Sequence, residues 1–241
     1  MENEVQEFKD KVNKLKDIIN ESNNIVFFGG AGVSTESGIP DFRSKDGLYN
    51  QHYKFPPEQI LSHTFFMSNT KDFYDFYRDK MNSLKYEPNI THIKLAELEK
   101  IGKLKAVVTQ NIDGLHQKAG SKTVYELHGS VLRNYCMDCH KFYGPEDIFN
   151  SQDIPRCECG GVIKPDVVLY EEGLDDDTVR GAINAIMEAD TLIVGGTSLT
   201  VYPASGLINY FNYLSISSLI FSSINSGFSI GDNLITTLPF K

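Results

Sequence analysis

The sequence predicts an α/β protein built around an open parallel sheet. Several short apolar runs lead directly into glycine or small polar residues, and we expect each run to form a buried strand. These runs are residues 26–28, 105–108, 124–127 and 192–194. Polar residues just past the carboxyl ends of strands lie where open α/β sheets bind ligands. We therefore expect the loops after these strands to meet at one edge of the sheet and to carry the function.

Composition and charge narrow the class of protein. The chain has 241 residues, 41% hydrophobic and 23% charged, which suits one large domain with an insertion or two unequal domains. The net charge of -9 argues against nonspecific binding to nucleic acid and favours a basic partner, such as a lysine-bearing protein segment. No apolar run reaches the ~18 residues of a membrane span, and the charged N-terminus is unlike a signal peptide. We expect a cytoplasmic monomer with no nucleic-acid or membrane partner.

Helices are predicted around the first two strands. Apolar residues recur every three or four positions over residues 5–19, which predicts a helix with one buried face. Residues 46–88 combine turn signals with aromatic-rich helical stretches, so we expect a small helical module whose aromatic side chains form its core. Another helix fits residues 91–99.

The segment GGAGVSTESGIPDFRS, residues 29–44, follows the first predicted strand. Its glycines allow a tight turn in which backbone N–H groups face an anion such as phosphate. Ser34 and Thr35 can cap a following helix, which Pro40 keeps short. The segment departs from the G-x-G-x-x-G dinucleotide fingerprint, and a glycine-rich turn alone is also compatible with a purely structural role.

All four cysteines of the chain lie between residues 131 and 164. Cys136 and Cys139 are spaced C-x2-C, and Cys157 and Cys159 follow as C-x-C after seventeen intervening residues. Two close pairs at this separation predict one tetrahedral structural zinc ion with no open position for chemistry. Two disulfides are the alternative, which the absence of a secretory signal disfavours. His140 is a ligand in principle, although we expect it to be solvated.

Taken in order, the motifs resemble the sirtuin family of bacterial type, the NAD-dependent protein lysine deacylases. The resemblance extends from residue 28 to about residue 204, through GAGVSTESGIPDFRS, TQNIDGLHQKAG, ELHGS, the cysteine pairs, KPDVVLYEE and GTSLTVYPA. It implies a Rossmann-like NAD-binding large domain and a small domain, with NAD and the acylated lysine in the cleft between them. The large domain would comprise residues 1–45, 89–130 and 165–241, and the small domain a helical module (46–88) and a zinc-binding module (131–164).

The resemblance also implies which residues bind NAD. Phe42 would shield the nicotinamide end, Gln110 would touch the adjacent ribose, and Asp113 would accept a hydrogen bond from the carboxamide. The phosphates and ribose would lie against Ala31, Gly32, Ser34 and Arg43, and the nicotinamide pocket would be lined by Asn111, Ile112 and Asp113. The full expected set is Gly30, Ala31, Gly32, Ser34, Thr35, Phe42, Arg43, Gln110, Asn111, Ile112, Asp113, Gly196, Thr197, Ser198 and Asn225.

His128 resembles the catalytic base of the family, with Asn111 and Asp113 as further catalytic residues. An unperturbed imidazole pKa near ~6.5 suits proton abstraction at neutral pH. The implied reaction starts when the acetyl-lysine carbonyl oxygen attacks the ribose C1′ and nicotinamide leaves. His128 then draws a proton from the ribose hydroxyls, and the products are free lysine and 2′-O-acetyl-ADP-ribose. For His116, in the GLHQKAG motif, we expect a packing or hydrogen-bonding role.

The acylated protein or peptide substrate would bind as an added strand, by main-chain hydrogen bonds. The resemblance places it between Val168, Leu169, Tyr170 and Glu171 on one side and residues 196–201, including Val201, on the other. Family members selective for succinyl or malonyl groups carry Tyr-x-x-Arg in the helical module. Here the residue three positions after Tyr74 is Tyr77, and the residue three positions after Tyr77 is Lys80. Arg78 is out of register with this spacing, because residues one apart on a helix do not share a face. We therefore expect acetyl or other uncharged acyl groups.

The C-terminal residues 213–241 depart from the family pattern. Seven serines fall between Ser215 and Ser229, where the family has a clean apolar strand ending in Ile-Asn. Ile224 and Asn225 are the candidates for that pair, but the composition also resembles a shifted reading frame joined after about Asn212. Because of this tail, a module that binds NAD or the acetylated peptide but is impaired in catalysis remains an alternative. Mono-ADP-ribosyl transfer, which cleaves the same glycosidic bond, is a second enzymatic alternative.

Overall fold

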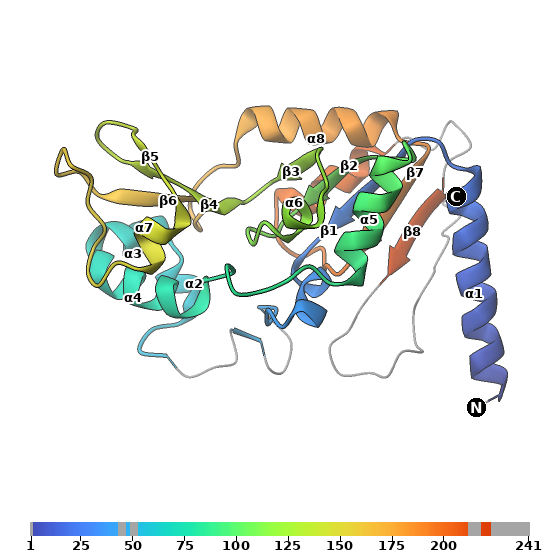
Figure 1. Cartoon of the computed structure of the whole chain (residues 1–241), viewed down its shortest axis with the longest axis horizontal. Helices are drawn as coiled ribbons and strands as arrows, with labels where there is room; N and C mark the ends of the chain where they lie inside the picture. The colour runs from blue at the N-terminus through green and yellow to red at the C-terminus, as the bar shows by residue number, and fades with distance from the viewer. Residues whose placement is uncertain (1, 43–46, 49–52, 212–217, 223–241) are drawn as a thin grey trace.

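The computed structural model describes residues 2–42, 47–48, 53–211 and 218–222, and the side chains of residues 5–42, 47–48 and 53–211. Figure 1 shows two sheets placed end to end along the long axis of the molecule. The larger sheet has five strands in the order β3-β2-β1-β7-β8, all parallel. Its strands are β1 (Ile25–Gly29), β2 (Leu104–Thr109), β3 (Val124–Glu126), β7 (Thr191–Gly195) and β8 (Ser218–Ser222). This order, in which the chain runs outward from β1 to β3 and then returns to β7, is that of a doubly wound α/β sheet.

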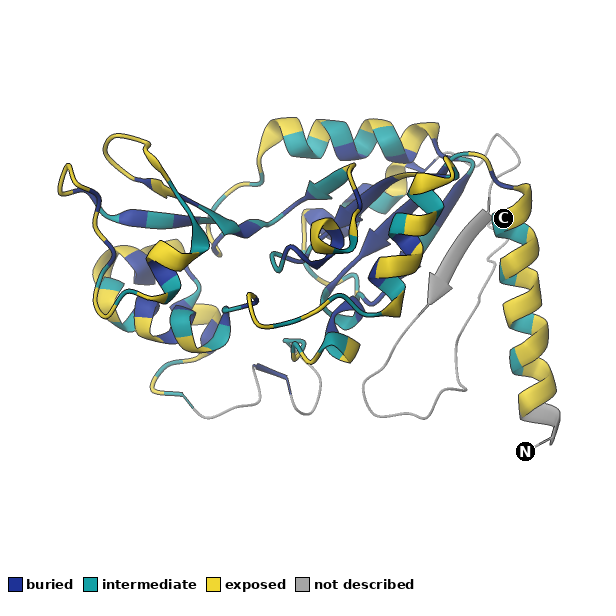
Figure 2. Ribbon diagram, viewed as in Figure 1, coloured by how far each residue is buried: buried dark blue, intermediate teal, exposed yellow. Residues whose placement is uncertain are grey.

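Both faces of the large sheet are covered, which explains why its strands are apolar without alternation. Val26 and Phe28 of β1 pack toward α8 (Asp176–Glu188) and the 3₁₀ helix η4 (Ala204–Tyr210). Ile25 and Phe27 point the other way, toward α5 (Ile90–Lys100). In Figure 2 strands β1, β2 and β7 are mostly buried, and the helices beside them have exposed outer faces. The prediction of an α/β protein with an open parallel sheet is confirmed.

The N-terminal helix α1 (Glu2–Glu21) lies beside the β8 edge of this sheet, at the end of the molecule (Figure 1). Lys103 fixes its carboxyl end, because its Nζ donates to the carbonyl oxygens of Ile19, Asn20 and Ser22 at 2.7–3.0 Å. A lysine in this position satisfies carbonyls that a helix end leaves unpaired. Among the described residues, no helix is both long and apolar enough to cross a membrane.

The smaller sheet is antiparallel and has the order β5-β4-β6. Its strands are β4 (Gly129–Cys136), β5 (Phe142–Tyr143) and β6 (Ile163–Val167). The helices that pack against it are α2 (Pro57–Ile60), α3 (His63–Ser68), α4 (Thr70–Lys80) and α7 (Pro145–Phe149). The expected helical module therefore exists, and it shares one core with the cysteine-bearing segment.

Aromatic side chains form most of the core of the helical module, as the sequence predicts. Phe73 stacks on Tyr77 at 5.5 Å between ring centroids, and Tyr77 stacks in turn on Phe149 of α7 at 5.7 Å. Tyr74 reaches the small sheet and donates its hydroxyl to the carbonyl of Ile163. These rings join the helices to the sheet and are buried, so they serve packing rather than ligand binding.

The last described strand of the large sheet lies in the serine-rich region that departs from the family pattern. Ser218–Ser222 pairs in register with all of Thr191–Gly195. Backbone hydrogen bonds do not depend on side-chain type, so serines are compatible with this edge strand. Asn225 and the Ile224-Asn225 pair lie outside the described residues.

Candidate functional site

The glycine segment turns sharply at the carboxyl end of β1, where it meets the end of β7. The N–H of Gly32 donates to the carbonyl oxygen of Gly196 at 2.8 Å. A Cβ on Gly32 would stand 2.9 Å from the Cα of Gly196, and a Cβ on Gly30 would stand 2.9 Å from the Cβ of Thr197. Two backbones approach too closely for any side chain, so only glycine fits there.

Two short 3₁₀ turns follow, η1 (Ala31–Val33) and η2 (Thr35–Ser37). The prediction of a short helix before Pro40 is confirmed, but the prediction that Ser34 caps it is wrong. Ser34 makes no capping bond with its side chain. Instead its Oγ donates to Oδ2 of Asp113 at 2.6 Å, and it accepts from Nδ2 of Asn111 at 3.0 Å. A buried hydroxyl facing a carboxylate makes a stronger bond there than with a helix N–H.

The loop after β2 therefore brings three of the predicted site residues together. Oδ1 of Asp113 accepts the N–H of Leu115 at 2.9 Å, so both carboxylate oxygens are held. The carbonyl of Ile112 accepts the N–H of Val131, which ties this loop to β4. The side chains of Ser34, Asn111 and Asp113 thus have fixed orientations.

Gln110 links the loops after β2 and β7. Its Nε2 donates to Oγ1 of Thr197 at 2.9 Å. Ser198 is exposed next to Thr197, and its Oγ lies 2.8 Å from Oγ1 of Thr200. The predicted residues at the ends of β1, β2 and β7 are therefore brought to one edge of the sheet, as the parallel arrangement requires.

His128 lies between the two sheets and is partly buried. Its Nδ1 is 3.0 Å from the carbonyl oxygen of Gln110. Because a carbonyl only accepts, Nδ1 carries the hydrogen and Nε2 of the neutral ring holds a lone pair. Burial lowers the pKa of His128, and the hydrogen bond to Gln110 opposes that shift. The ring is thus a neutral proton acceptor at Nε2 near pH 7.

Close contacts hold the backbone on both sides of His128 in place. Its carbonyl accepts the N–H of Val168 at 3.0 Å. Gly129 has a φ of 76°, and a Cβ there would stand 2.0 Å from the carbonyl oxygen of Asp166. Glycine is required at this position both by its conformation and by the space available.

The segment predicted to pair with a substrate strand already makes main-chain bonds within the chain. The N–H of Tyr170 donates to Leu61, and the carbonyl of Tyr170 accepts from His63, at 2.9 and 3.0 Å. The N–H of Leu169 donates to the carboxylate of Glu172 at 2.9 Å. The Tyr170 side chain is 39% exposed, and Val201 begins the turn to η4, its carbonyl bonded to Ser205. Strand pairing with a substrate remains a prediction.

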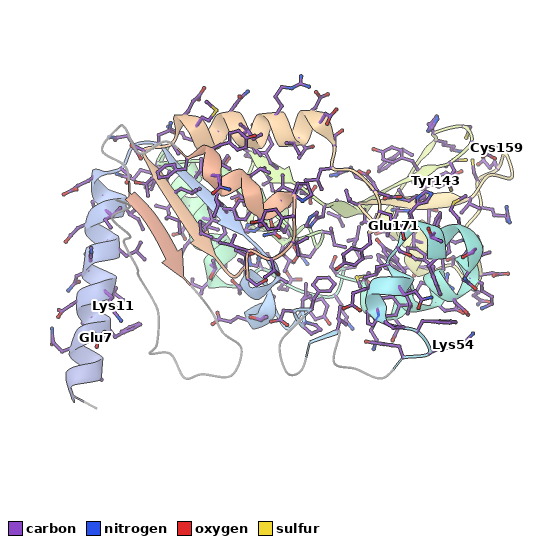
Figure 3. All side chains as sticks on the ribbon, turned by 180° about the vertical axis from the view of Figure 1, so that it is seen from behind. Glu7, Lys11, Lys54, Tyr143, Cys159 and Glu171 are labelled. Carbon is purple, nitrogen blue, oxygen red and sulfur yellow. The ribbon has the colours of Figure 1, made fainter. Side chains whose placement is uncertain are left out.

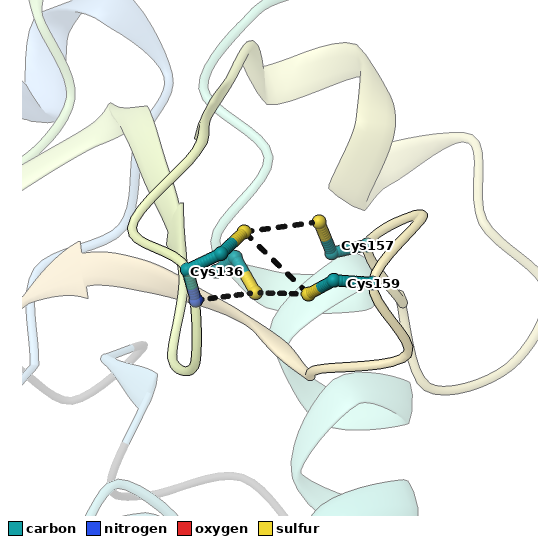
Figure 4. Close-up of side chains that lie close together, drawn as sticks. Cys136, Cys157 and Cys159 are labelled. Carbon is teal, nitrogen blue, oxygen red and sulfur yellow. Dashed lines mark hydrogen bonds between the residues drawn. The ribbon is translucent and has the colours of Figure 1, made fainter.

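The four cysteines gather at the far end of the small domain. Their Sγ atoms all lie within 4.8 Å of one another, and the nearest pairs are 3.4–3.5 Å apart (Figure 4). A disulfide would require about 2.05 Å, whereas four thiolates at about 2.3 Å from one ion stand roughly 3.8 Å apart. The thiols are free, so the disulfide alternative is excluded and the geometry fits a structural zinc site.

A neighbouring hydroxyl favours the thiolate form of Cys157. The Tyr143 hydroxyl donates to Sγ of Cys157 at 3.0 Å, and this bond is the main reason that the pKa of Cys157 falls to about 6. In Figure 3 Tyr143 and Cys159 lie in the cysteine region, while Glu171 is nearer the large sheet. His140 is exposed and is not one of the four clustered ligands, which confirms the expectation.

Arg78 is engaged in joining two parts of the small domain. It donates to the carbonyl of Asp153 at 2.8 Å and to Oγ of Ser151 at 3.0 Å, and it pairs with Asp75 at 2.7 Å. These partners come from α4 itself and from the turn after α7. The guanidinium is thus occupied by structural contacts, in keeping with the prediction that it does not hold an acyl carboxylate.

Of the other residues predicted to bind NAD, some are described by the structure and some are not. Phe42 is partly buried and packs against the core of the small domain. Thr35 donates its hydroxyl to the carbonyl of Gly32 at 3.0 Å, which tightens the junction of η1 and η2. Arg43 lies outside the described residues, as does Asn225.

His92 and Asn89, for which the sequence predicts no role at the site, lie near its residues. His92 is fully buried, and its ring centroid is 4.7 Å from that of His116, which also packs on Phe27. Asn89 caps α5 and also reaches the glycine segment. An asparagine just before a predicted helix is a sequence signal for an N-cap, but its second contact has no local signal.

Comparisons with known proteins agree with this geometry. A family model described as the Sir2 family matches residues 30–203. A protein of Clostridium perfringens named NAD-dependent protein deacetylase is 65% identical over 205 residues, which is 84% of each chain. A protein of the same name from Clostridium acetobutylicum is 64% identical over 206 residues, also 84% of each chain.

Solved structures of Sir2 proteins are also similar to this chain. A Sir2 variant with a deacetylated p53 peptide and 3′-O-acetyl ADP-ribose matches with a TM-score of 0.79 at 41% identity, over 87% of this chain and 85% of that one. A complex of Sir2 with a p53 peptide and NAD⁺ matches with a TM-score of 0.77 at 40% identity, over 92% and 90%.

Proposed function

We propose, on the premise that this chain belongs to the Sir2 family, that the loops after β1, β2 and β7 form its NAD pocket and that His128 is its general base. The protein is an NAD-dependent protein deacetylase, which transfers the acetyl group of acetyl-lysine to ADP-ribose and releases nicotinamide. It uses NAD as co-substrate and a structural zinc ion. The assignment of individual residues below is our proposal.

The phosphates of NAD are proposed to lie against Gly30, Ala31 and Gly32, where the backbone is bare. Support comes from the glycine turn, where no Cβ fits between the ends of β1 and β7 and little side chain separates a phosphate from the main chain. Ser34, Asn111 and Asp113 would hold the carboxamide end, since their side chains already form one hydrogen-bonded group. NAD, when bound, supplies the glycosidic bond whose cleavage activates the ribose.

The observation that carries the base assignment is the bond from Nδ1 of His128 to the Gln110 carbonyl. It fixes the tautomer, so Nε2 is the atom that accepts a proton. The same residue, Gln110, reaches Thr197 in the loop after β7, which couples the orientation of the base to the proposed NAD pocket. Burial lowers the pKa of His128, so the ring stays neutral and able to accept a proton at pH values slightly below neutrality.

The substrate is proposed to be an acetylated protein segment lying along Val168–Tyr170 and Val201. The proximity of Val168 to His128, whose main chains are bonded at 3.0 Å, would bring the acetyl-lysine to the base. We propose that the enzyme is a monomer, as the sequence analysis expects. Unoxidised cysteines at metal-binding distances favour a reducing compartment, and we propose the cytoplasm.

The zinc ion is proposed to hold the small domain without taking part in the chemistry. All four positions of a tetrahedral ion are filled by Cys136, Cys139, Cys157 and Cys159. The domain division is likewise proposed as the sequence predicts it, with β4 crossing from the large domain at Gly129 into the zinc-binding module.

The test is mass spectrometry of an acetyl-lysine peptide incubated with the protein and NAD. We expect loss of the acetyl group in the wild type, and a rate lower by about 10²–10⁴-fold in His128→Ala and His128→Asn. Asn retains a donor for the Gln110 carbonyl, so this variant separates the loss of the base from a loss of local structure. An unchanged rate in either folded variant would refute the base assignment. Label from NAD appearing on protein instead of on a soluble product would favour mono-ADP-ribosyl transfer.

A further inference from the structure

The linker that joins α4 to α5, residues 81–89, contacts both loops of the proposed NAD pocket. Ser83 is buried, and its Oγ donates to the carbonyl of Asp113 at 2.9 Å. The ring of Tyr86 lies 3.4 Å from the position that a Cβ on Gly38 would take. At the end of the linker, Asn89 donates from Nδ2 to the carbonyl of Val33 at 2.7 Å. The linker thus packs behind the glycine segment.

The carbonyl of Val33 lies at the junction of η1 and η2. Neighbouring carbonyls are satisfied within the segment: that of Gly30 by the N–H of Val33, that of Ala31 by the N–H of Ser34, and that of Gly32 by the Thr35 hydroxyl. Where one 3₁₀ turn ends and the next begins, a carbonyl is left without a partner from its own turn. The Asn89 side chain supplies that partner from another element.

Asn89 uses both ends of its side-chain amide. Its Oδ1 accepts the N–H of Thr91 at 2.9 Å, which caps α5, while Nδ2 reaches Val33. Its own N–H donates to Nδ1 of His92, so the residue is held from a third direction. Serine and aspartate also cap helices well, but aspartate has no donor, and the serine hydroxyl is one atom too short to take the place of Nδ2. The second bond is therefore a property of asparagine that capping does not require.

We propose that Asn89 is a positioning residue for NAD, which holds the η1–η2 junction in its binding conformation. The inference rests on the proposed function of the glycine segment. Val33 is followed directly by Ser34, whose hydroxyl orders Asp113 and Asn111. Loss of the bond to Val33 frees the backbone on which Ser34 is placed, so both the phosphate turn and the carboxamide end lose order. Val168, along which the substrate is proposed to lie, is bonded to His128 rather than to this junction.

The test compares Asn89→Asp, Asn89→Ser and Asn89→Ala by calorimetric titration with NAD and with ADP-ribose, and by thermal unfolding without ligand. We expect all three to bind NAD roughly 3- to 10-fold more weakly, as for one lost hydrogen bond. Only Asn89→Ala loses the cap as well, so it should unfold about 2–4 °C earlier than the other two variants. The KM for the acetylated peptide should stay within about twofold of the wild type at saturating NAD.

The two cap-retaining variants decide the question. NAD affinity equal to the wild type in Asn89→Asp and Asn89→Ser would overturn the proposal and leave Asn89 as a cap alone. A defect confined to Asn89→Asp would also overturn it, because it would report the added negative charge near the phosphates rather than the lost donor. Failure of the wild type itself to bind NAD would instead refute the proposed pocket, so the two failures are distinguishable.

Discussion

The edge of the large sheet proposed to bind NAD and the cysteine cluster of the small domain hold their functional groups in different ways. At the sheet edge, Ser34 comes from one loop and Asn111 and Asp113 from another, 77 or more residues away, and a few hydrogen bonds hold the three side chains. In the cluster, Cys136 and Cys139 lie on one short turn and Cys157 and Cys159 on another, all converging on one point. Each hydrogen bond contributes about 1 kcal/mol net, whereas a structural zinc ion contributes about 10 or more.

This difference has a functional consequence. A co-substrate must enter and leave, so its site has to be ordered by many weak contacts that can adjust. A structural ion never leaves during turnover, so four ligands can close around it completely. The strength of each region therefore follows from what it binds, and three perturbations test that contrast.

Removal of zinc should have the largest effect. Cys157→Ser, or exhaustive chelation, is expected to unfold the small domain, because the apparent binding energy of structural zinc is about 10–16 kcal/mol in small domains. The hydrogen bonds among Ser34, Asn111 and Asp113 lie within the large domain, so some ADP-ribose binding should survive while deacetylation is lost.

Circular dichroism, metal analysis and calorimetric titration with ADP-ribose measure these outcomes. The matched control is Glu158→Gln, which removes an exposed ion pair with Lys141 beside the ligands and should leave zinc content unchanged. A small domain that remains folded after stoichiometric loss of zinc would contradict the contrast.

Acidification should have the next largest effect, through His116 beneath the NAD edge. Burial, with a contribution from His92, lowers the pKa of His116 to about 3, whereas the unfolded chain protonates near ~6.5. Between these values only the unfolded state gains the proton, so stability falls as the pH falls. The loss is about 1.4 kcal/mol per pH unit across that window.

Urea unfolding of the wild type and His116→Phe between pH 7.5 and pH 4 measures this loss. The phenyl ring keeps the packing on Phe27 and His92, so stability at pH 7.5 should change little, and the acid slope should become shallower. The groups that face the pair include Asp113, whose charge favours protonated His92. If the free energy of unfolding fell equally with pH in the wild type and in His116→Phe, the loss of stability in acid could not be assigned to His116.

The smallest of the three effects is expected for the ion pairs of Arg133, one of which joins the two sheets. Arg133 of β4 donates to Glu126 of β3 at 2.6 Å and to Asp166 of β6 at 2.8 Å. The Arg133 and Asp166 side chains are more than a third exposed, so solvent screens their pair, but the Glu126 side chain is only 6% exposed. Arg133→Met should cost about 1–2 kcal/mol, mostly by leaving the Glu126 carboxylate unpaired.

A double-mutant cycle of Arg133→Met with Glu126→Gln, read by urea unfolding, isolates this pair. We expect a coupling energy of about 1 kcal/mol that shrinks at high salt. Arg133→Lys is the control, since a single ammonium cannot serve both carboxylates with the geometry of a guanidinium. Additive effects of the two changes would show that the link between the sheets is not energetic.

The sequence by itself determined the features that depend on neighbours along the chain. The strands at residues 26–28, 105–108 and 192–194 are apolar because both sheet faces are covered, and the parallel order then places their loops at one edge. The cysteine spacing fixed the metal site, because ligands two or three residues apart on a turn already face one point. The motif resemblance supplied His128, whose role as the base stays a prediction, while the family itself is shown by the match over residues 30–203.

Only the tertiary structure decided where individual polar side chains direct their hydrogen bonds. Ser34 prefers a carboxylate 79 residues away to a local cap, and Asn89 reaches a carbonyl 56 residues away. The buried pair of His92 and His116 likewise joins two helices that no sequence pattern connects. Such choices depend on which partner a folded neighbour presents and on how far water is excluded there, and neither quantity exists until the chain has packed.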